Sequence, residues 1–82
     1  MDKDKIYEKL KEILVSEFKL EPDSIGAEKQ LDEDLGLDSL DTIDLLLYFG
    51  DFIERKIDPV MFKDAHTIQN VVDLLHTLWK SA

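Results

Sequence analysis

The sequence predicts an all-α fold, a small bundle of three main helices and one short helix, with a long loop between the first and second main helices. Apolar residues recur at the three- and four-residue spacing of helix faces, and no segment alternates as a strand does. The chain has 82 residues, 44% of them hydrophobic, which suits one domain with one modest core. It contains no cysteine, so packing alone must hold the fold together. We therefore expect residues 1–82 to form a single domain.

The first helix is predicted to run from Lys3 to Phe18. Asp2 and Asp4 lie at its start, where the helix dipole favours negative charge. Its apolar residues fall on one face, which we expect to be buried; they are Ile6, Leu10, Ile13, Leu14 and Phe18.

The segment from Leu20 to Asp38 has no sustained period and contains one proline and two glycines, so it is predicted to be a loop. A connection of this length is uncommon in a compact domain unless it is functional or disordered. Spaced apolar residues favour an ordered loop that is pinned to the core; they are Ile25, Leu31 and Leu35.

The second helix is predicted to begin after Asp38 and to end near Glu54. The Asp38 carboxylate can accept a hydrogen bond from a free N–H group of the first turn. One side of this helix is predicted to join the core and carries Ile43, Leu46, Phe49 and Ile53. A neighbouring stripe mixes acidic and apolar residues and is predicted to be a docking surface; it carries Leu40, Asp44, Leu47, Tyr48 and Asp51.

Two further helical segments are predicted in the last third of the chain. Pro59 suits the first position of a short helical turn that continues to Phe62, because its fixed φ is already that of a helix. Thr67 is predicted to open a last helix that reaches Lys80. The apolar side of that helix carries Ile68, Val71, Val72, Leu75, Leu78 and Trp79.

The charge balance excludes some functions and favours others. Ten Lys and Arg against nineteen Asp and Glu give a net charge of −9, which argues against nucleic-acid binding and favours partners with basic patches. The longest apolar run, Leu45 to Phe49, is too short to span a bilayer. Residues 1–10 alternate charged and apolar side chains, unlike a secretion signal, so we expect a cytoplasmic protein.

The most informative segment is LGLDSLDTIDLLL, residues 35–47, in which a glycine-bearing loop leads Ser39 to the start of a helix. This arrangement resembles the acyl carrier proteins, whose modified serine sits in an Asp-Ser-Leu triplet at the head of the second helix. Here that triplet is Asp38, Ser39 and Leu40. The resemblance continues through the turn at residues 57–59 to TIQNVVDLL, residues 67–75, and so covers essentially the whole domain.

The resemblance implies that Ser39 carries 4′-phosphopantetheine, whose terminal thiol holds acyl groups as thioesters. It implies a monomeric carrier with an acyl chain as cargo, and no catalytic residues of its own. The implied partners are a phosphopantetheinyl transferase and acyl-loading and acyl-processing enzymes with basic docking patches. Asp38 and Leu40 flank the attachment point, and the implied partner face comprises Leu40, Asp41, Asp44, Leu47, Tyr48, Asp51 and Glu54.

Departures from the family pattern follow directly along the second helix. Fatty-acid carriers usually continue with small and then consecutive acidic residues, whereas this chain has Tyr48, Phe49, Gly50, Asp51 and Phe52. We therefore expect a specialised carrier for a lipid, polyketide or other acyl pathway rather than the housekeeping fatty-acid carrier.

Two alternatives to an acyl carrier stay open at this point. A D-alanyl or aminoacyl carrier would share the serine-bearing helix. An acidic helical adaptor that is never modified would use Asp38 and Ser39 only as a helix cap.

No metal site is predicted. An EF-hand loop starting at Asp32 would need glycine and glutamate where Leu37 and Ile43 stand. His66 and His76 have no second histidine or cysteine at ligand spacing, so structural or solvent-facing roles are expected for them.

Overall fold

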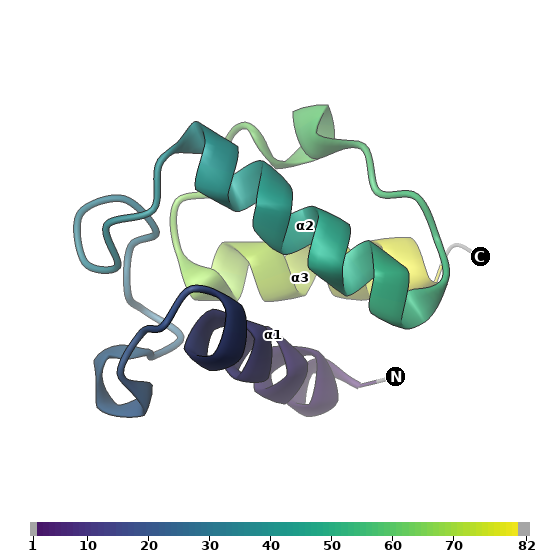
Figure 1. Ribbon diagram of the computed structural model, residues 1–82. Helices are drawn as coiled ribbons and strands as arrows, with labels where there is room; N and C mark the ends of the chain where they lie inside the picture. The colour runs from purple at the N-terminus through teal and green to yellow at the C-terminus, as the bar shows by residue number, and fades with distance from the viewer. Residues whose placement is uncertain (1, 81–82) are drawn as a thin grey trace.

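The computed structural model describes residues 2–80 and is helical, with two short 3₁₀ turns in its connections (Figure 1). The elements in chain order are α1 (Lys3–Glu17), η1 (Pro22–Ser24), α2 (Ser39–Ile53), η2 (Pro59–Phe62) and α3 (Ile68–Lys80). In this part of the chain α1 packs against both α2 and α3, and the second 3₁₀ turn, η2, packs against α2. The predicted all-α bundle is confirmed, and η1 is an additional turn that the sequence pattern did not predict.

Both ends of α1 are closed by local hydrogen bonds. The Asp2 carboxylate accepts from the Lys5 backbone N–H at 2.9 Å, as its place before the first turn predicts. At the other end the chain turns through a left-handed residue, Lys19, with φ 58°, and the Leu20 N–H donates to the Leu14 carbonyl at 3.2 Å. The helix therefore ends at Glu17, one residue before the predicted end.

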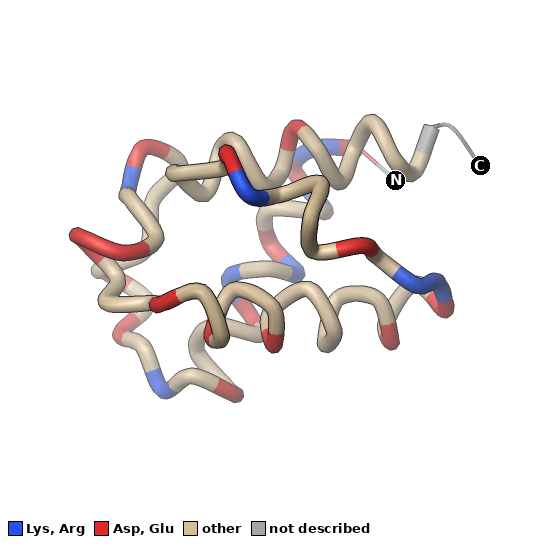
Figure 2. The backbone as a smooth tube through the Cα atoms, turned by 90° about the horizontal axis from the view of Figure 1, so that it is seen from above, with Lys and Arg blue, Asp and Glu red and all other residues tan. Residues whose placement is uncertain are grey.

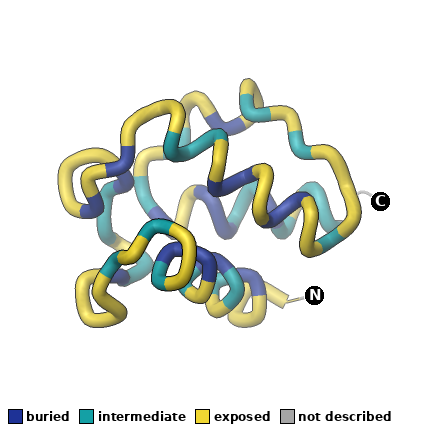
Figure 3. Tube along the Cα trace, in the orientation of Figure 1, coloured by how far each residue is buried: buried dark blue, intermediate teal, exposed yellow. Residues whose placement is uncertain are grey.

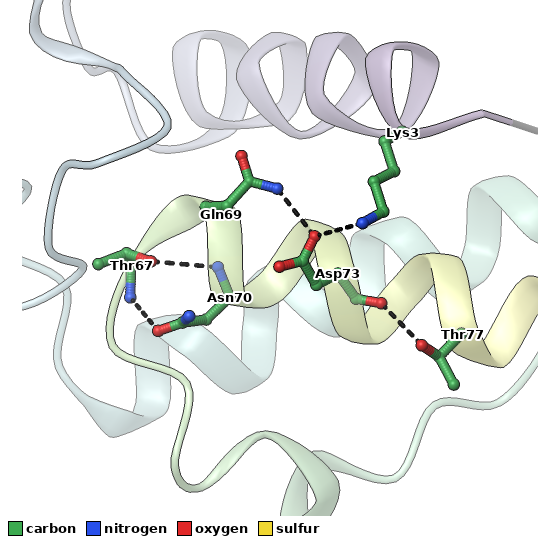
Figure 4. Close-up of polar contacts among 6 residues, drawn as sticks. All are labelled: Lys3, Thr67, Gln69, Asn70, Asp73 and Thr77. Atoms are coloured by element: carbon green, nitrogen blue, oxygen red, sulfur yellow. Dashed lines mark hydrogen bonds and ion pairs between the residues drawn. The ribbon is translucent and has the colours of Figure 1, made fainter.

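The start of α3 is held by a reciprocal pair of caps (Figure 4). The Thr67 hydroxyl accepts from the Asn70 N–H at 3.1 Å, and the Asn70 side-chain oxygen accepts from the Thr67 N–H, also at 3.1 Å. Thr67 is therefore the residue that caps α3, and the helix itself begins at Ile68, one position later than predicted.

The core lies between the three helices, and the long loop closes one end of it (Figures 1 and 3). The residues predicted to be buried on α1 are confirmed except Phe18, which is half-buried. The buried apolar side chains are Ile6, Leu10, Ile13, Leu14, Ile25, Leu31, Leu35, Leu37, Leu45, Leu46, Phe49, Phe62, Ile68, Val71, Val72 and Leu75.

The prediction for α2 was wrong in detail. Ile43 and Ile53 are only half-buried, whereas Leu45, which the predicted core face omitted, is completely buried. The reason is the position of α1, because the contacts of Lys9 with Phe52 and of Phe18 with Tyr48 place α1 on the side of α2 that also carries Leu45 and Phe49. Ile43 lies on the opposite flank and faces a groove.

The long loop is ordered because its backbone is bonded to the start of α3. The Leu31 N–H donates to the His66 carbonyl at 2.8 Å, and the Ile68 N–H donates to the Lys29 carbonyl at 3.1 Å. A third bond runs from the Gln69 N–H to the Ala27 carbonyl at 2.8 Å. Ile25, Leu31 and Leu35 are buried as predicted, which confirms a loop pinned to the core, and Leu37 is a further anchor.

Gly50 allows the chain to reverse tightly after α2. The Arg55 N–H donates to the Gly50 carbonyl at 3.0 Å, and Glu54 between them is left-handed, with φ 57°. A β-carbon on Gly50 would lie 2.6 Å from the Arg55 carbonyl oxygen, too close for any other residue without a shift of the backbone. Glycine is therefore required here by the approach of the following turn.

Candidate attachment site at the start of helix α2

The loop delivers Ser39 to its place through a closed turn at residues 31–37. The Leu37 N–H donates to the Leu31 carbonyl at 2.8 Å, and the Gly36 N–H donates to the Asp32 carbonyl at 3.0 Å. Gly36 has φ 70°, a left-handed conformation that favours glycine. Leu37 then enters the core, so the chain is anchored two residues before Ser39.

A capping box fixes the first turn of α2. The Asp38 carboxylate accepts from the Asp41 N–H at 2.9 Å, and the Asp41 carboxylate accepts from the Asp38 N–H at 3.3 Å. The Thr42 hydroxyl adds a bond to the Asp38 carbonyl at 3.2 Å. Ser39 is the first residue of the helix and is exposed, so its hydroxyl is presented to solvent from a fixed backbone.

The electrostatics of this helix start suit an anionic ester. The first N–H groups of a helix have no partners within it, and together they give that end a partial positive charge. The Asp41 and Thr42 N–H groups are already bonded to Asp38. Those of Ser39 and Leu40, the first two of the helix, lie ahead of these bonds and can serve a phosphate attached to the serine oxygen.

A groove of about 600 Å³ opens beside Ser39, between α2, η2 and the long loop. Most of its lining is apolar, and Phe62 is the most buried of the residues that η2 contributes. The polar part of the lining consists of Asp32, Asp38, Ser39, Thr42, Lys63 and His66. The apolar lining consists of Leu31, Leu37, Ile43, Pro59, Val60, Phe62 and Ala65.

Sequence reasoning missed the part of the groove that lies beyond α2. No role was predicted for Lys63, and His66 was expected to be structural or solvent-facing. Both residues line the groove. His66 is exposed, and its backbone carbonyl also accepts the bond from Leu31. Neither residue carries a sequence signal for this placement, because the groove forms only when η2 folds back against α2.

The predicted partner face follows the outer side of α2. Acidic positions are spaced along this helix, and basic positions are absent from residues 39–53 (Figure 2). Leu40 and Leu47 are 71% and 57% exposed, and their seven-residue spacing places them on one side of the helix. Asp44, Asp51 and Glu54 are exposed, as is Tyr48, whereas Asp41 is half-buried by its role in the cap.

Neither a metal centre nor a membrane-spanning helix is found among residues 2–80. Among residues 2–80, no three His, Asp or Glu side chains are arranged so that they could hold a metal ion. None of the helices in this range is both long enough and apolar enough to cross a membrane.

Comparison with known proteins gives a consistent result over most of the chain. Residues 8–75 match the family described as "Phosphopantetheine attachment site". The chain is 31% identical to "Acyl carrier protein 2" of Ralstonia nicotianae over 78 residues, which is 95% of this chain and 96% of that protein. It is 32% identical to "Acyl carrier protein" of Petrotoga mobilis, over 92% of this chain and 88% of the other.

The family match over residues 8–75 and the similarity to acyl carrier proteins over most of the chain place this protein in the class of carrier proteins. The chain is a member of the phosphopantetheine-attachment family of acyl carrier proteins. The prosthetic group of this family is 4′-phosphopantetheine, and the exposed serine and the adjacent groove fit such a group.

Proposed function

We propose that this chain carries acyl intermediates on a 4′-phosphopantetheine arm attached to Ser39, for fatty-acid, lipid or polyketide biosynthesis. The observation that carries the proposal is the presentation of Ser39 on a rigid support. The residue is exposed at the first position of α2, between the buried anchor Leu37 and the Asp38–Asp41 cap. When bound, the arm supplies a thiol that holds the cargo as a thioester.

The attachment step follows from the chemistry of the serine hydroxyl. The Ser39 oxygen attacks the pantetheine-bearing phosphorus of coenzyme A, which forms a serine–phosphate ester bond. The phosphoanhydride bond of coenzyme A breaks, and adenosine bisphosphate leaves. We assign the base that accepts the hydroxyl proton to the transferase.

The groove beside Ser39 is a suitable binding place for the arm and the first part of its cargo. Its lining is mainly apolar, and burial of an acyl chain is favoured by about 0.8 kcal/mol per CH₂ group. Phe62 closes the groove toward the core with a large side chain that is 3% exposed. Lys63 lines the groove together with Asp32 and Asp38, so the charge of the lining is mixed.

The outer face of α2 supports docking by enzymes with basic patches. Long-range attraction between acidic and basic surfaces speeds encounter, and exposed apolar side chains such as Leu40 and Leu47 then add contact area. The enzymes perform the chemistry, and this chain presents the substrate to them.

Intact-mass measurement after incubation with coenzyme A and a phosphopantetheinyl transferase tests the attachment. We expect the mass of one arm to be added to the wild type, and none to Ser39→Ala.

Ser24→Ala is a matched control for this experiment. Asp23, Ser24 and Ile25 repeat the pattern of aspartate, serine and an aliphatic residue, but they lie in and beside the short turn η1. The Ser24 hydroxyl there donates to the Glu21 carbonyl at 2.7 Å. The control variant should be modified like the wild type. Absence of modification on the wild type would contradict the proposal and would favour an unmodified adaptor.

We further propose a specialised pathway rather than general fatty-acid elongation. The support is the bulky and glycine-containing second half of α2, from Tyr48 to Phe52. We expect elongation enzymes of the general pathway to use the loaded protein less efficiently than their usual carrier. Equal efficiency would contradict a specialised role, and loading by an amino-acid ligase would show an aminoacyl carrier instead.

A further inference from the structure

A second hollow, of about 190 Å³, lies where α2 and α3 end on the same side of the bundle (Figure 1). It shares no lining residue with the groove beside Ser39. The 15-residue helix α2 places about 21 Å between Ser39 and Ile53, which lines the hollow. We call this hollow the far pocket. Its apolar walls come from Ile53, Ile57, Leu75 and Leu78, and the rest of its lining comes from Arg55, Lys56 and Trp79.

Arg55 is held in place at both its backbone and its side chain. Its N–H donates to the Gly50 carbonyl at 3.0 Å, and its own carbonyl oxygen packs so closely that only glycine fits opposite it. The guanidinium carbon lies 5.0 Å from the centre of the Trp79 ring, a cation–π contact. A guanidinium group that is already ordered loses less freedom when it binds an anion. The tight turn at Gly50 therefore builds one wall of the far pocket.

The charge at the far pocket is positive, although the chain as a whole is acidic. Neither Arg55 nor Lys56 is paired with a carboxylate within residues 2–80. Their acidic neighbours in the sequence, Glu54 and Asp58, do not line the pocket, and the Asp58 carboxylate accepts from the Val60 N–H at 3.0 Å. The carbonyl ends of α2 and α3 each contribute a partial negative charge of about one half, which two full cations outweigh.

The size and lining of the far pocket define the chemistry of a ligand. Its volume equals that of about six water-sized groups at about 30 Å³ each, so it suits a body much smaller than a drug molecule. Leu75 is buried at the base, and Ile57, Leu78 and Trp79 are half-buried, which favours hydrocarbon. Arg55 favours a carboxylate, because the guanidinium fork matches both carboxylate oxygens.

We propose that the far pocket binds a small monocarboxylate with a compact apolar body of about five or six carbons. The body lies between Ile57, Leu78 and Trp79, and the carboxylate pairs with Arg55 and Lys56. This would be a second, noncovalent ligand site at the end of the molecule remote from Ser39. The inference does not require modification of Ser39, so it stands or falls independently of the proposed function.

Titration with three probes at constant ionic strength tests the proposal. Hexanoate has both the carboxylate and the apolar body, acetate has the charge alone, and 1-hexanol has the body alone. Trp79 is the only tryptophan of the chain, so its fluorescence reports on the far pocket. We expect hexanoate to give a saturable change with a Kd near about 1 mM, at least about tenfold below the Kd of either other probe.

Charge-removing variants assign the site, with equilibrium dialysis of radiolabelled hexanoate as a readout that does not depend on Trp79. We expect Arg55→Gln to raise the Kd about tenfold, and Arg55→Lys, which keeps the charge but loses the fork, to raise it about threefold. Lys63→Gln is the matched control, because it removes the same charge from the groove beside Ser39. Its Kd should stay within about twofold of the wild type, since salt screens distant charges. Thermal melts confirm that each variant is folded.

Three results would overturn the inference. Hexanol binding as tightly as hexanoate would show an apolar hollow without a role for the cations. Acetate or inorganic phosphate binding as tightly would show general attraction of anions, and so would an equal loss in Arg55→Gln and Lys63→Gln. Absence of saturable hexanoate binding at tens of millimolar would show that the pocket has no such ligand. Arm attachment to Ser39, measured separately by mass, remains the test of the proposed function in every case.

Discussion

The backbone around Gly50 requires glycine, although alanine is the more favourable residue within a helix. Alanine at a helix position is normally favoured over glycine by about 1 kcal/mol. We nevertheless expect Gly50→Ala to lower the free energy of unfolding by about 1–3 kcal/mol, because the new methyl group would meet the Arg55 carbonyl oxygen at 2.6 Å. Urea denaturation measures the change.

Gly26→Ala serves as the control for this prediction. A β-carbon at Gly26 would meet only the flexible side chains of Glu28 and Lys29, at 3.4 Å and beyond. We expect this variant to be neutral or slightly stabilising, because alanine restricts the unfolded chain. A Gly50→Ala protein as stable as the wild type would show that the turn after α2 relaxes freely.

Asp73 links α3 to α1 and gives the fold a dependence on acid (Figure 4). Hydrogen bonding to the Lys3 ammonium group, at 2.9 Å, and then to the Gln69 amide lowers the pKa of the Asp73 carboxyl. A lowered pKa in the folded state stabilises the protein above the pKa of the unfolded state, about 3.9 for aspartate, and this contribution is lost as the pH falls through the folded value.

The expected size of this effect is small because both partners are about half exposed. We expect Asp73→Asn to lower the free energy of unfolding by about 0.5 kcal/mol near neutral pH, and the difference from the wild type to disappear as the pH falls below about 4. Chemical denaturation at several pH values measures it. A difference that persists at low pH would assign the effect to the amide substitution and not to the ion pair.

At the scale of the elements, the Asp38–Asp41 capping box has a structural role that is separable from modification. We expect Asp38→Ala to lower the free energy of unfolding by about 1 kcal/mol, since the Asp41 N–H loses its acceptor, and Asp38→Asn to retain most of the stability. Thermal denaturation of the unmodified protein measures both. Equal losses in the two variants would indicate that charge at the helix start, and not the hydrogen bond, is what matters.

The helices could be predicted from the sequence because their signals are local. Apolar spacing placed α1 and α3 within one residue of their observed ends, and Asp38 marked the start of α2. Burial on α2 was less predictable. Whether Ile43 or Leu45 is buried depends on which side of α2 faces α1. The residues next to them in the sequence do not indicate this.

The candidate site also has one part that the sequence predicts and another that depends on tertiary packing. The place of Ser39 at a helix start follows from Asp38 and Gly36, whose roles in caps and turns are local. The groove beside it depends on Phe62 and Lys63, which reach α2 only through tertiary packing. The edge-on contact between the Phe18 and Tyr48 rings, with centroids 6.1 Å apart, likewise joins residues that are 30 positions apart, so no sequence pattern could have revealed it.

At the scale of the whole molecule, a net charge of −9 lowers the stability of the fold and strengthens attraction to basic partners. Like charges repel within the compact state, and added salt screens them, so we expect the melting temperature to rise with sodium chloride. The same screening weakens attraction to a basic partner, so we expect KM for arm attachment to rise over the same range. Melting curves and kinetics in matched buffers test both, and a fall in both quantities would contradict the electrostatic account.

The hydrogen bonds between residues 27–31 and the first turn of α3 bear on how far this protein can reach. Ser39 is held by α2 and by the loop before it, and this loop is hydrogen-bonded to the start of α3. The anchor point therefore travels with the body of the molecule as one piece. Under the proposed function, the extension that brings cargo into a deep active site comes from the arm on Ser39, whose length sets the limit.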